Sequence, residues 1–119
     1  MATYPLKKYR LNRKEFKEVL GKGRTFKIGS LILKVLFKEK GKKFGFLISK
    51  RILKKATQRN KIKRRLREIL RETVDNLKDG IRAVFIASHG LEKKEFLELK
   101  EIFKQLIKRA QLIKDESSY

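Results

Sequence analysis

The residues best suited to chemistry lie in one basic segment, KRILKKATQRNKIKRRLR, which runs from Lys50 to Arg67. The segment holds ten basic residues and no acidic one: Lys50, Arg51, Lys54, Lys55, Arg59, Lys61, Lys63, Arg64, Arg65 and Arg67. Arginine binds phosphate oxygens through two parallel hydrogen bonds, stays charged at physiological pH and stacks on nucleobases. The segment therefore favours binding of a polyanion, and the Arg59–Asn60 pair followed by further cations favours RNA.

A helix must hold these cations on one side, and we predict one over residues 57–77. At about 100° per residue, its apolar positions share one face. They are Ile62, Leu66, Ile69, Leu70, Thr73 and Leu77. The opposite face carries a polar and cationic stripe. It consists of Asn60, Lys63, Arg64, Arg67 and Arg71. We predict that this helix buries its leucines and presents the stripe to RNA.

Two other interpretations of the basic helix stay open. A cationic face is often merely solvated, but no acidic residue precedes Glu68 in the segment, so pairing within the helix does not neutralise it. Basic amphipathic helices also bind membrane surfaces or calmodulin-type partners. That second interpretation is disfavoured because the apolar face is needed for the core.

Composition supports a folded chain with an anionic partner. Of 119 residues, 34 are Lys or Arg and 13 are Asp or Glu, giving a net charge of +21. Such a charge makes the folded state repel itself unless a polyanion neutralises it. Hydrophobic residues make up 40%, which suffices for the core of a single RNA-binding domain over residues 1–119. We expect a basic N-terminal arm over residues 1–10 and a frayed C-terminus over residues 115–119.

Several function classes are disfavoured by what the sequence lacks. Without cysteine, the chain has no disulfide, thiol nucleophile or cysteine-bound zinc. His89 is the only histidine, and no third residue completes a catalytic set with Ser88. The carboxylates do not recur at the spacing of a two-metal nuclease. We therefore predict no catalytic residue and no metal ligand on the protein. With no signal-peptide pattern and no bilayer-length apolar run, we expect a cytoplasmic location.

Helices and strands alternate in a way that predicts an α/β fold. Asn12 and Glu15 form a capping-box pattern that begins the first helix, and Gly21 and Gly23 end it. Alternating or continuous apolar residues predict strands over 25–28, 30–38, 43–49 and 81–87. A last amphipathic helix is expected over 92–114. We expect the strands over 30–38 and 43–49 to form an antiparallel hairpin. Helices on a mixed sheet fit this order.

The basic segment resembles the signature of the bacterial ribonuclease P protein subunit. The resemblance rests on Ser49-Lys50-Arg51, Lys55-Ala56, the run from Arg59 to Arg64, and Arg67-Glu68. It extends to Arg10-Leu11, Phe16, Gly23 and Phe44-Gly45-Phe46. It implies an α-β-β-β-α-β-α two-layer sandwich with a mixed four-stranded sheet and a left-handed β-α-β crossover.

The resemblance also implies a function. The family's protein pairs with a large catalytic RNA, and the two together remove the 5′ leader of precursor tRNA by Mg²⁺-dependent hydrolysis. The RNA performs the chemistry, and the Mg²⁺ is held mainly by the RNA subunit and the substrate. The implied partners are thus the catalytic RNA and precursor tRNA, with no membrane and no small-molecule substrate. A ribosomal-type or chaperone RNA-binding protein without a role in cleavage is the alternative.

Two sets of residues follow from the resemblance and the basic segment. The predicted RNA-binding set is Lys50, Arg51, Lys55, Arg59, Asn60, Lys63, Arg64, Arg67 and Arg71. The predicted leader-binding set is Phe16, Ile32 and Lys34. The sequence leaves open whether Phe16 is a core residue or a platform for base stacking. Leu20 and Lys34 stand where the family often has aromatic residues, which predicts a cleft that relies more on charge. Lys54 stands where glycine is common, so the path of the basic loop is expected to differ.

Overall fold

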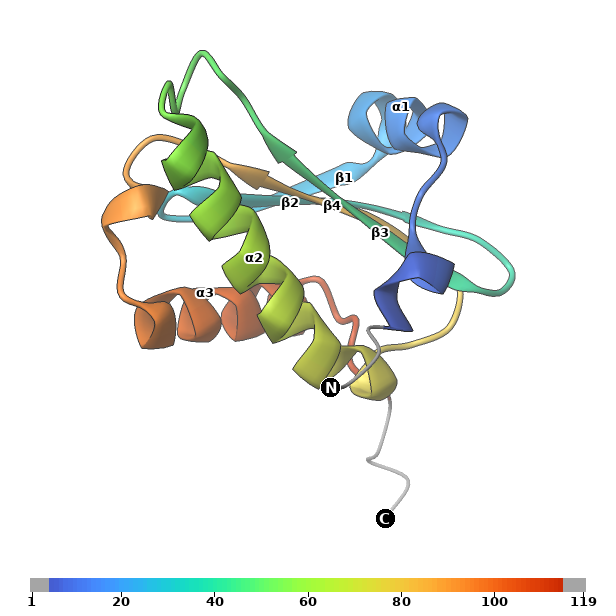
Figure 1. Ribbon diagram of the computed structural model, residues 1–119. Helices are drawn as coiled ribbons and strands as arrows, with labels where there is room; N and C mark the ends of the chain where they lie inside the picture. The colour runs from blue at the N-terminus through green and yellow to red at the C-terminus, as the bar shows by residue number, and fades with distance from the viewer. Residues whose placement is uncertain (1–4, 115–119) are drawn as a thin grey trace.

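The computed structural model describes residues 5–114 and has the predicted order of elements (Figure 1). The helices and strands are α1 (Arg13–Lys22), β1 (Arg24–Ile28), β2 (Leu31–Phe37), β3 (Lys42–Ile48), α2 (Ala56–Thr73), β4 (Ile81–Ala87) and α3 (Phe96–Arg109). Three short 3-10 turns add to them: η1 (Pro5–Tyr9), η2 (Val74–Asn76) and η3 (Leu91–Lys93). The α2 helix is shorter than predicted because η2 follows it. The α3 helix is shorter because η3 precedes it and because it ends at Arg109, just before the positive φ of Gln111.

The four strands form one mixed sheet in the order β1-β2-β4-β3. The β1–β2 and β2–β4 pairs are antiparallel, whereas β3 and β4 are parallel and are joined through α2. The sheet is therefore mixed, as predicted, but the expected hairpin between β2 and β3 is wrong because β4 lies between them. The turn after β2 does not close a hairpin, because Gly41 in this turn is hydrogen-bonded to Asp79 and to Ile81 at the start of β4. The Gly41 N–H donates to Asp79 Oδ1 at 2.7 Å, and the Gly41 carbonyl accepts from the Ile81 N–H at 3.1 Å.

The helices cover the two faces of the sheet unequally. Figure 1 shows α2 and α3 on one side and α1 on the other. The main core lies under α2 and α3, where the rings of Phe85 and Phe103 stack with centroids 4.3 Å apart. A smaller cluster packs α1 onto the other face around the buried Val19 and Val84. The fold is thus the predicted two-layer sandwich, with the short helix α1 added on the other face of the sheet.

The first helix is anchored at its start. Asn12 Oδ1 accepts from the Glu15 N–H at 2.8 Å, and the Asn12 N–H donates to Glu15 Oε1 at 3.1 Å, which confirms the predicted capping box. The Glu15 carboxylate also accepts from Arg82 Nε of β4 at 3.2 Å. Burial alone would raise the pKa of Glu15, but the hydrogen bonds from Asn12 and Arg82 outweigh it and lower the pKa.

The segment before α1 is part of the fold. The Leu11 N–H donates to the Phe44 carbonyl at 3.1 Å, and Arg10 forms a parallel bridge with Phe44. Residues 5–10 of the predicted arm therefore lie along β3, the edge strand beside α2. The expected frayed end at 115–119 and the first four residues of the arm lie outside the described residues.

Candidate nucleic-acid interface

The α2 helix separates its side chains as the sequence predicts. Ile62, Leu66, Ile69 and Leu70 are at most 2% exposed and pack into the main core. On the other side, four of the five stripe residues are exposed: Asn60, Lys63, Arg64 and Arg67. The fifth, Arg71, is half-buried and pairs with Glu68. The amphipathic interpretation of this helix is confirmed, because one face stabilises the scaffold while the other offers cations to a partner.

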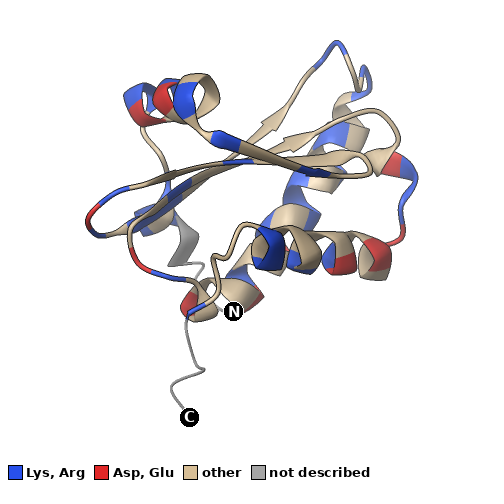
Figure 2. Ribbon diagram, turned by 180° about the vertical axis from the view of Figure 1, so that it is seen from behind, with Lys and Arg blue, Asp and Glu red and all other residues tan. Residues whose placement is uncertain are grey.

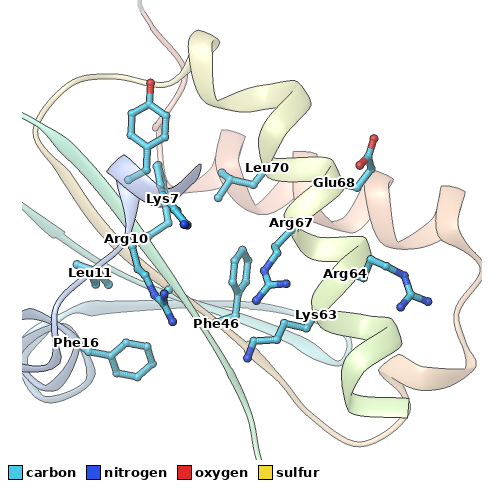
Figure 3. Close-up of a pocket in the computed structure, with 13 residues that line it drawn as sticks. Lys7, Arg10, Leu11, Phe16, Phe46, Lys63, Arg64, Arg67, Glu68 and Leu70 are labelled. Carbon is cyan, nitrogen blue, oxygen red and sulfur yellow. The ribbon is translucent and has the colours of Figure 1, made fainter. Parts of the chain in front are cut away.

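A groove opens at the outer edge of β3, between η1, α1 and α2 (Figure 3). Its volume is about 670 Å³. Its walls combine apolar and aromatic residues, namely Tyr9, Leu11, Phe16, Phe44, Gly45, Phe46 and Leu70. Charged residues complete the lining, namely Lys7, Arg10, Lys63, Arg64, Arg67 and Glu68. We refer to this site as the β3 groove.

The β3 groove joins the two predicted sets of residues. Phe16 comes from the predicted leader-binding set, and Lys63, Arg64 and Arg67 come from the predicted RNA-binding set. Phe16 is held there by close packing. A Cβ at Gly45 would lie only 2.7 Å from Cε2 of the Phe16 ring. The ring is half-buried, so it serves both as packing for α1 and as part of the groove wall.

The charge of the groove is almost entirely positive. Its one carboxylate, Glu68, is paired with Arg71, which lies outside the lining. Within residues 5–114, no ion pair engages Lys63, Arg64 or Arg67. Figure 2 shows Lys and Arg along most of α2, whose two acidic residues, Glu68 and Glu72, lie in its C-terminal third. Five cations against one paired carboxylate make the groove attractive to phosphate.

Arg59 has a different environment from the arginines that line the groove. Its Nη1 donates to the carbonyls of Leu53 and Lys54 at 2.7 and 2.9 Å. The loop that it clasps is also tied internally, since the Ser49 carbonyl accepts from the Leu53 N–H at 2.9 Å. Arg59 therefore fixes the basic loop. The loop's own cations are exposed and lie outside the groove lining, namely Lys50, Arg51, Lys54 and Lys55.

The other two residues of the predicted leader-binding set lie apart from the groove. Ile32 and Lys34 are half-buried on the face of β2 that carries α1. Lys34 Nζ donates to the Leu20 carbonyl in the last turn of α1 at 2.8 Å. Ile32 lies opposite Ile86 of β4, and Ile86 in turn lies opposite Leu47 of β3. The structure thus places this pair on the open part of the sheet beside α1.

Nine of the thirteen lining residues lie outside the two predicted sets, among them Lys7, Tyr9, Arg10 and Phe46. The alternation of β3 did indicate that Phe46 faces the same side as Phe44. The contribution of η1 had no such signal, because it depends on the arm pairing with β3.

Neither clustered metal ligands nor a membrane-spanning helix is found in residues 5–114. No group of three or more His, Asp or Glu side chains there is arranged to hold a metal ion. Among the helices of this part of the chain, none combines the length and the apolar character needed to cross a membrane.

Comparisons with known proteins bear on the family and the fold. A family model described as Ribonuclease P matches residues 6–111. The ribonuclease P protein component of Pseudanabaena sp. is 34% identical over 107 residues, covering 87% of this chain and 92% of the relative. That of Clostridium kluyveri is 34% identical over 117 residues, covering 96% of this chain and 100% of the relative.

Solved structures show the same fold. The ribonuclease P protein of Thermotoga maritima superposes with a TM-score of 0.75 at 25% identity, covering 84% of this chain and 96% of the other. The ribonuclease P protein of Staphylococcus aureus superposes with a TM-score of 0.79 at 20% identity, covering 88% and 97%.

Proposed function

Because the chain belongs to the family of bacterial ribonuclease P protein components, subunits of a ribonucleoprotein endoribonuclease, we propose that it binds the catalytic RNA and the 5′ leader of precursor tRNA. In that role the RNA performs the cleavage, and the protein holds the two RNAs together. The observation that carries the proposal is the β3 groove, which unites Phe16 with Lys63, Arg64 and Arg67.

The cations of α2 and the basic loop would contact phosphates. Lys63, Arg64 and Arg67 project from a helix whose opposite face is fully buried, so binding RNA requires no unfolding of the core. If about 6 to 8 phosphates are neutralised, log K should fall against log salt with a slope of roughly −4 to −7. The exposed loop cations Lys50, Arg51 and Lys55 would extend the same positive surface, with the loop held in place by Arg59.

The leader, being single-stranded, would follow the sheet face beside α1. Phe16 stands where this face meets the β3 groove, and Ile32 and Lys34 continue the path along β2. Lys34 donates to the Leu20 carbonyl, so it supplies positive charge while also stabilising the end of α1. A path of this kind recognises phosphates and unstacked bases with little dependence on sequence.

The described part of the chain supports a Mg²⁺ that is held elsewhere. Residues 5–114 contain no cluster of carboxylates for that hard cation, which prefers oxygen ligands. We propose that the catalytic RNA and the substrate hold the Mg²⁺ that cleavage requires. The part of the protein is to neutralise phosphates and fix their positions.

Reconstitution tests the proposal. The full chain is mixed with a bacterial ribonuclease P RNA at low Mg²⁺ concentration, and cleavage is compared for precursor tRNAs with a long leader and a one-nucleotide leader. We expect the protein to restore cleavage and to favour the long leader. Absence of rescue with every bacterial ribonuclease P RNA tried would refute the proposal. Rescue without a preference for leader length would refute the leader-binding part alone.

A further inference from the structure

The wall of the β3 groove contains an aromatic ring that the core holds rigidly. Phe46 is half-buried, and its ring stacks on Phe85 with centroids 6.0 Å apart and planes inclined by 25°. Phe85 in turn stacks on the buried Phe103. Figure 3 shows Phe46 in the middle of the groove, with Arg10 on one side and Lys63 and Arg67 on the other. A fixed ring flanked by cations from two different elements needs no reorganisation to bind a flat, negatively charged ligand.

From this arrangement we propose that the β3 groove receives the base of a single unpaired nucleotide of RNA, stacked against Phe46. The phosphates on either side of that base are held by Arg10 from the η1 side and by Lys63 and Arg67 from α2. This inference rests on the proposed RNA-binding function and extends it to one nucleotide position. The groove volume of about 670 Å³ lies in the range of cavities that enclose small ligands.

The chemistry of the lining selects an unpaired nucleotide. A base inside a helix already has both faces stacked, whereas a splayed base offers a free face to an aromatic side chain. The single carboxylate in the described lining is paired with Arg71. Stacking on an aromatic ring depends little on the identity of the base, so we expect the groove to accept any of the four bases. Two sources supply such a nucleotide, the leader of precursor tRNA and the single-stranded loops of the catalytic RNA.

The first test replaces the ring. Phe46→Leu keeps an apolar side chain but removes the stacking face, and Phe37→Leu is the matched control because Phe37 is 52% exposed at the end of β2 and lies outside the groove. Both variants are assayed for affinity to the catalytic RNA and, in the holoenzyme, to precursor tRNA. We expect Phe46→Leu to weaken one of these affinities by about five- to a hundredfold, with an unchanged salt slope. Phe37→Leu should change neither. Equal effects of the two variants would overturn the inference.

The second test uses the wild-type protein, so it does not depend on the folding of a variant. Single abasic nucleotides, which keep the phosphate but lack the base, are introduced in turn along the leader and at the unpaired positions of the catalytic RNA. An abasic nucleotide at one position should weaken binding of the wild-type protein. The same abasic nucleotide should weaken binding of the Phe46→Leu variant little further, because the stacking contact is already lost. A coupled position in the leader identifies that source, and one in the catalytic RNA identifies the other.

The outcomes separate this inference from the proposed function. If leader cleavage is restored but no abasic position weakens binding of the wild-type protein, the nucleotide-binding inference is overturned while the proposed function stands. The inference is also overturned if the abasic and Phe46→Leu effects are additive everywhere, because the groove then binds only phosphates or some other acidic ligand. If reconstitution itself fails, the proposed function is at fault.

Discussion

Replacing Gly45 with alanine should displace the Phe16 ring from the β3 groove. A Cβ at this position would lie 2.7 Å from Cε2 and 2.9 Å from Cδ2 of Phe16, and 3.3 Å from Cδ1 of Leu11. Carbon atoms in ordinary contact are about 3.5 to 4.0 Å apart. The ring must therefore move by about 1 Å, measured against that contact distance. Overpacking of this kind typically costs about 1–3 kcal/mol.

The assay is urea-induced unfolding of four proteins: wild type, Gly45→Ala, Phe16→Ala and the double variant. In the wild-type background, Gly45→Ala should lower the free energy of unfolding by about 1–3 kcal/mol. In the Phe16→Ala background the ring is absent, so the same substitution should cost markedly less. Gly21→Ala is the control, because no atom beyond its chain neighbours and its own helix backbone lies within 4 Å of the added Cβ, and alanine favours a helix over glycine.

The cycle has a clear refuting result. If Gly45→Ala lowers the free energy of unfolding equally with and without the Phe16 ring, the cost of the added methyl group does not come from contact with that ring. That result would refute the argument. Loss of stability in Gly21→Ala as large as in Gly45→Ala would equally contradict the argument, since that site has space for a methyl group.

Two further predictions concern polar contacts. Arg59→Gln removes the charged donor to the Leu53 and Lys54 carbonyls, so the Leu53 amide should exchange its hydrogen faster, whereas Arg64→Gln should leave that amide unchanged. Equal protection of the Leu53 amide in both variants would contradict the role of Arg59 in holding the loop. Glu15 has a lowered pKa in the fold, so its contribution to stability is complete above the unfolded value near 4.5 and is lost as pH falls through the folded value. The unfolding free energy of Glu15→Gln should therefore lie below that of wild type at pH 7 and approach it in acid, and a gap that is constant with pH would refute this.

Local patterns allowed much of the structure to be predicted from the sequence. The capping box at Asn12 and Glu15 and the division of α2 into two faces depend on residues within a few turns, and both are confirmed. Four of the five residues of the α2 stripe are exposed as predicted, because spacing alone sets the side of a helix on which a residue lies. The pairing of Arg71 with Glu68 was not predicted.

Contacts between distant segments were out of reach of the sequence. The hairpin expected between β2 and β3 fails because the turn at Gly41 bonds to Asp79 and Ile81, nearly forty residues further along the chain. The groove depends on η1 lying beside β3, where the Leu11–Phe44 hydrogen bond holds it. No pattern of apolar residues in the sequence predicts that contact. Arg59 belongs to the same motif as Arg64, yet it donates hydrogen bonds to carbonyls of the preceding loop. The sequence pattern does not distinguish the two arginines.

The most direct test of the account compares two triple substitutions of equal charge. Lys63, Arg64 and Arg67 line the groove, whereas Lys104, Lys108 and Arg109 are equally exposed on α3. Each set is changed to glutamine, and binding to a bacterial ribonuclease P RNA is measured across a range of salt concentrations. The α2 triple should weaken binding strongly and make the salt slope shallower by roughly 2 to 3, with stability preserved, while the α3 triple should do much less. Equal losses from the two triples would show that binding follows net charge alone and would contradict the assignment of the RNA-binding surface to α2.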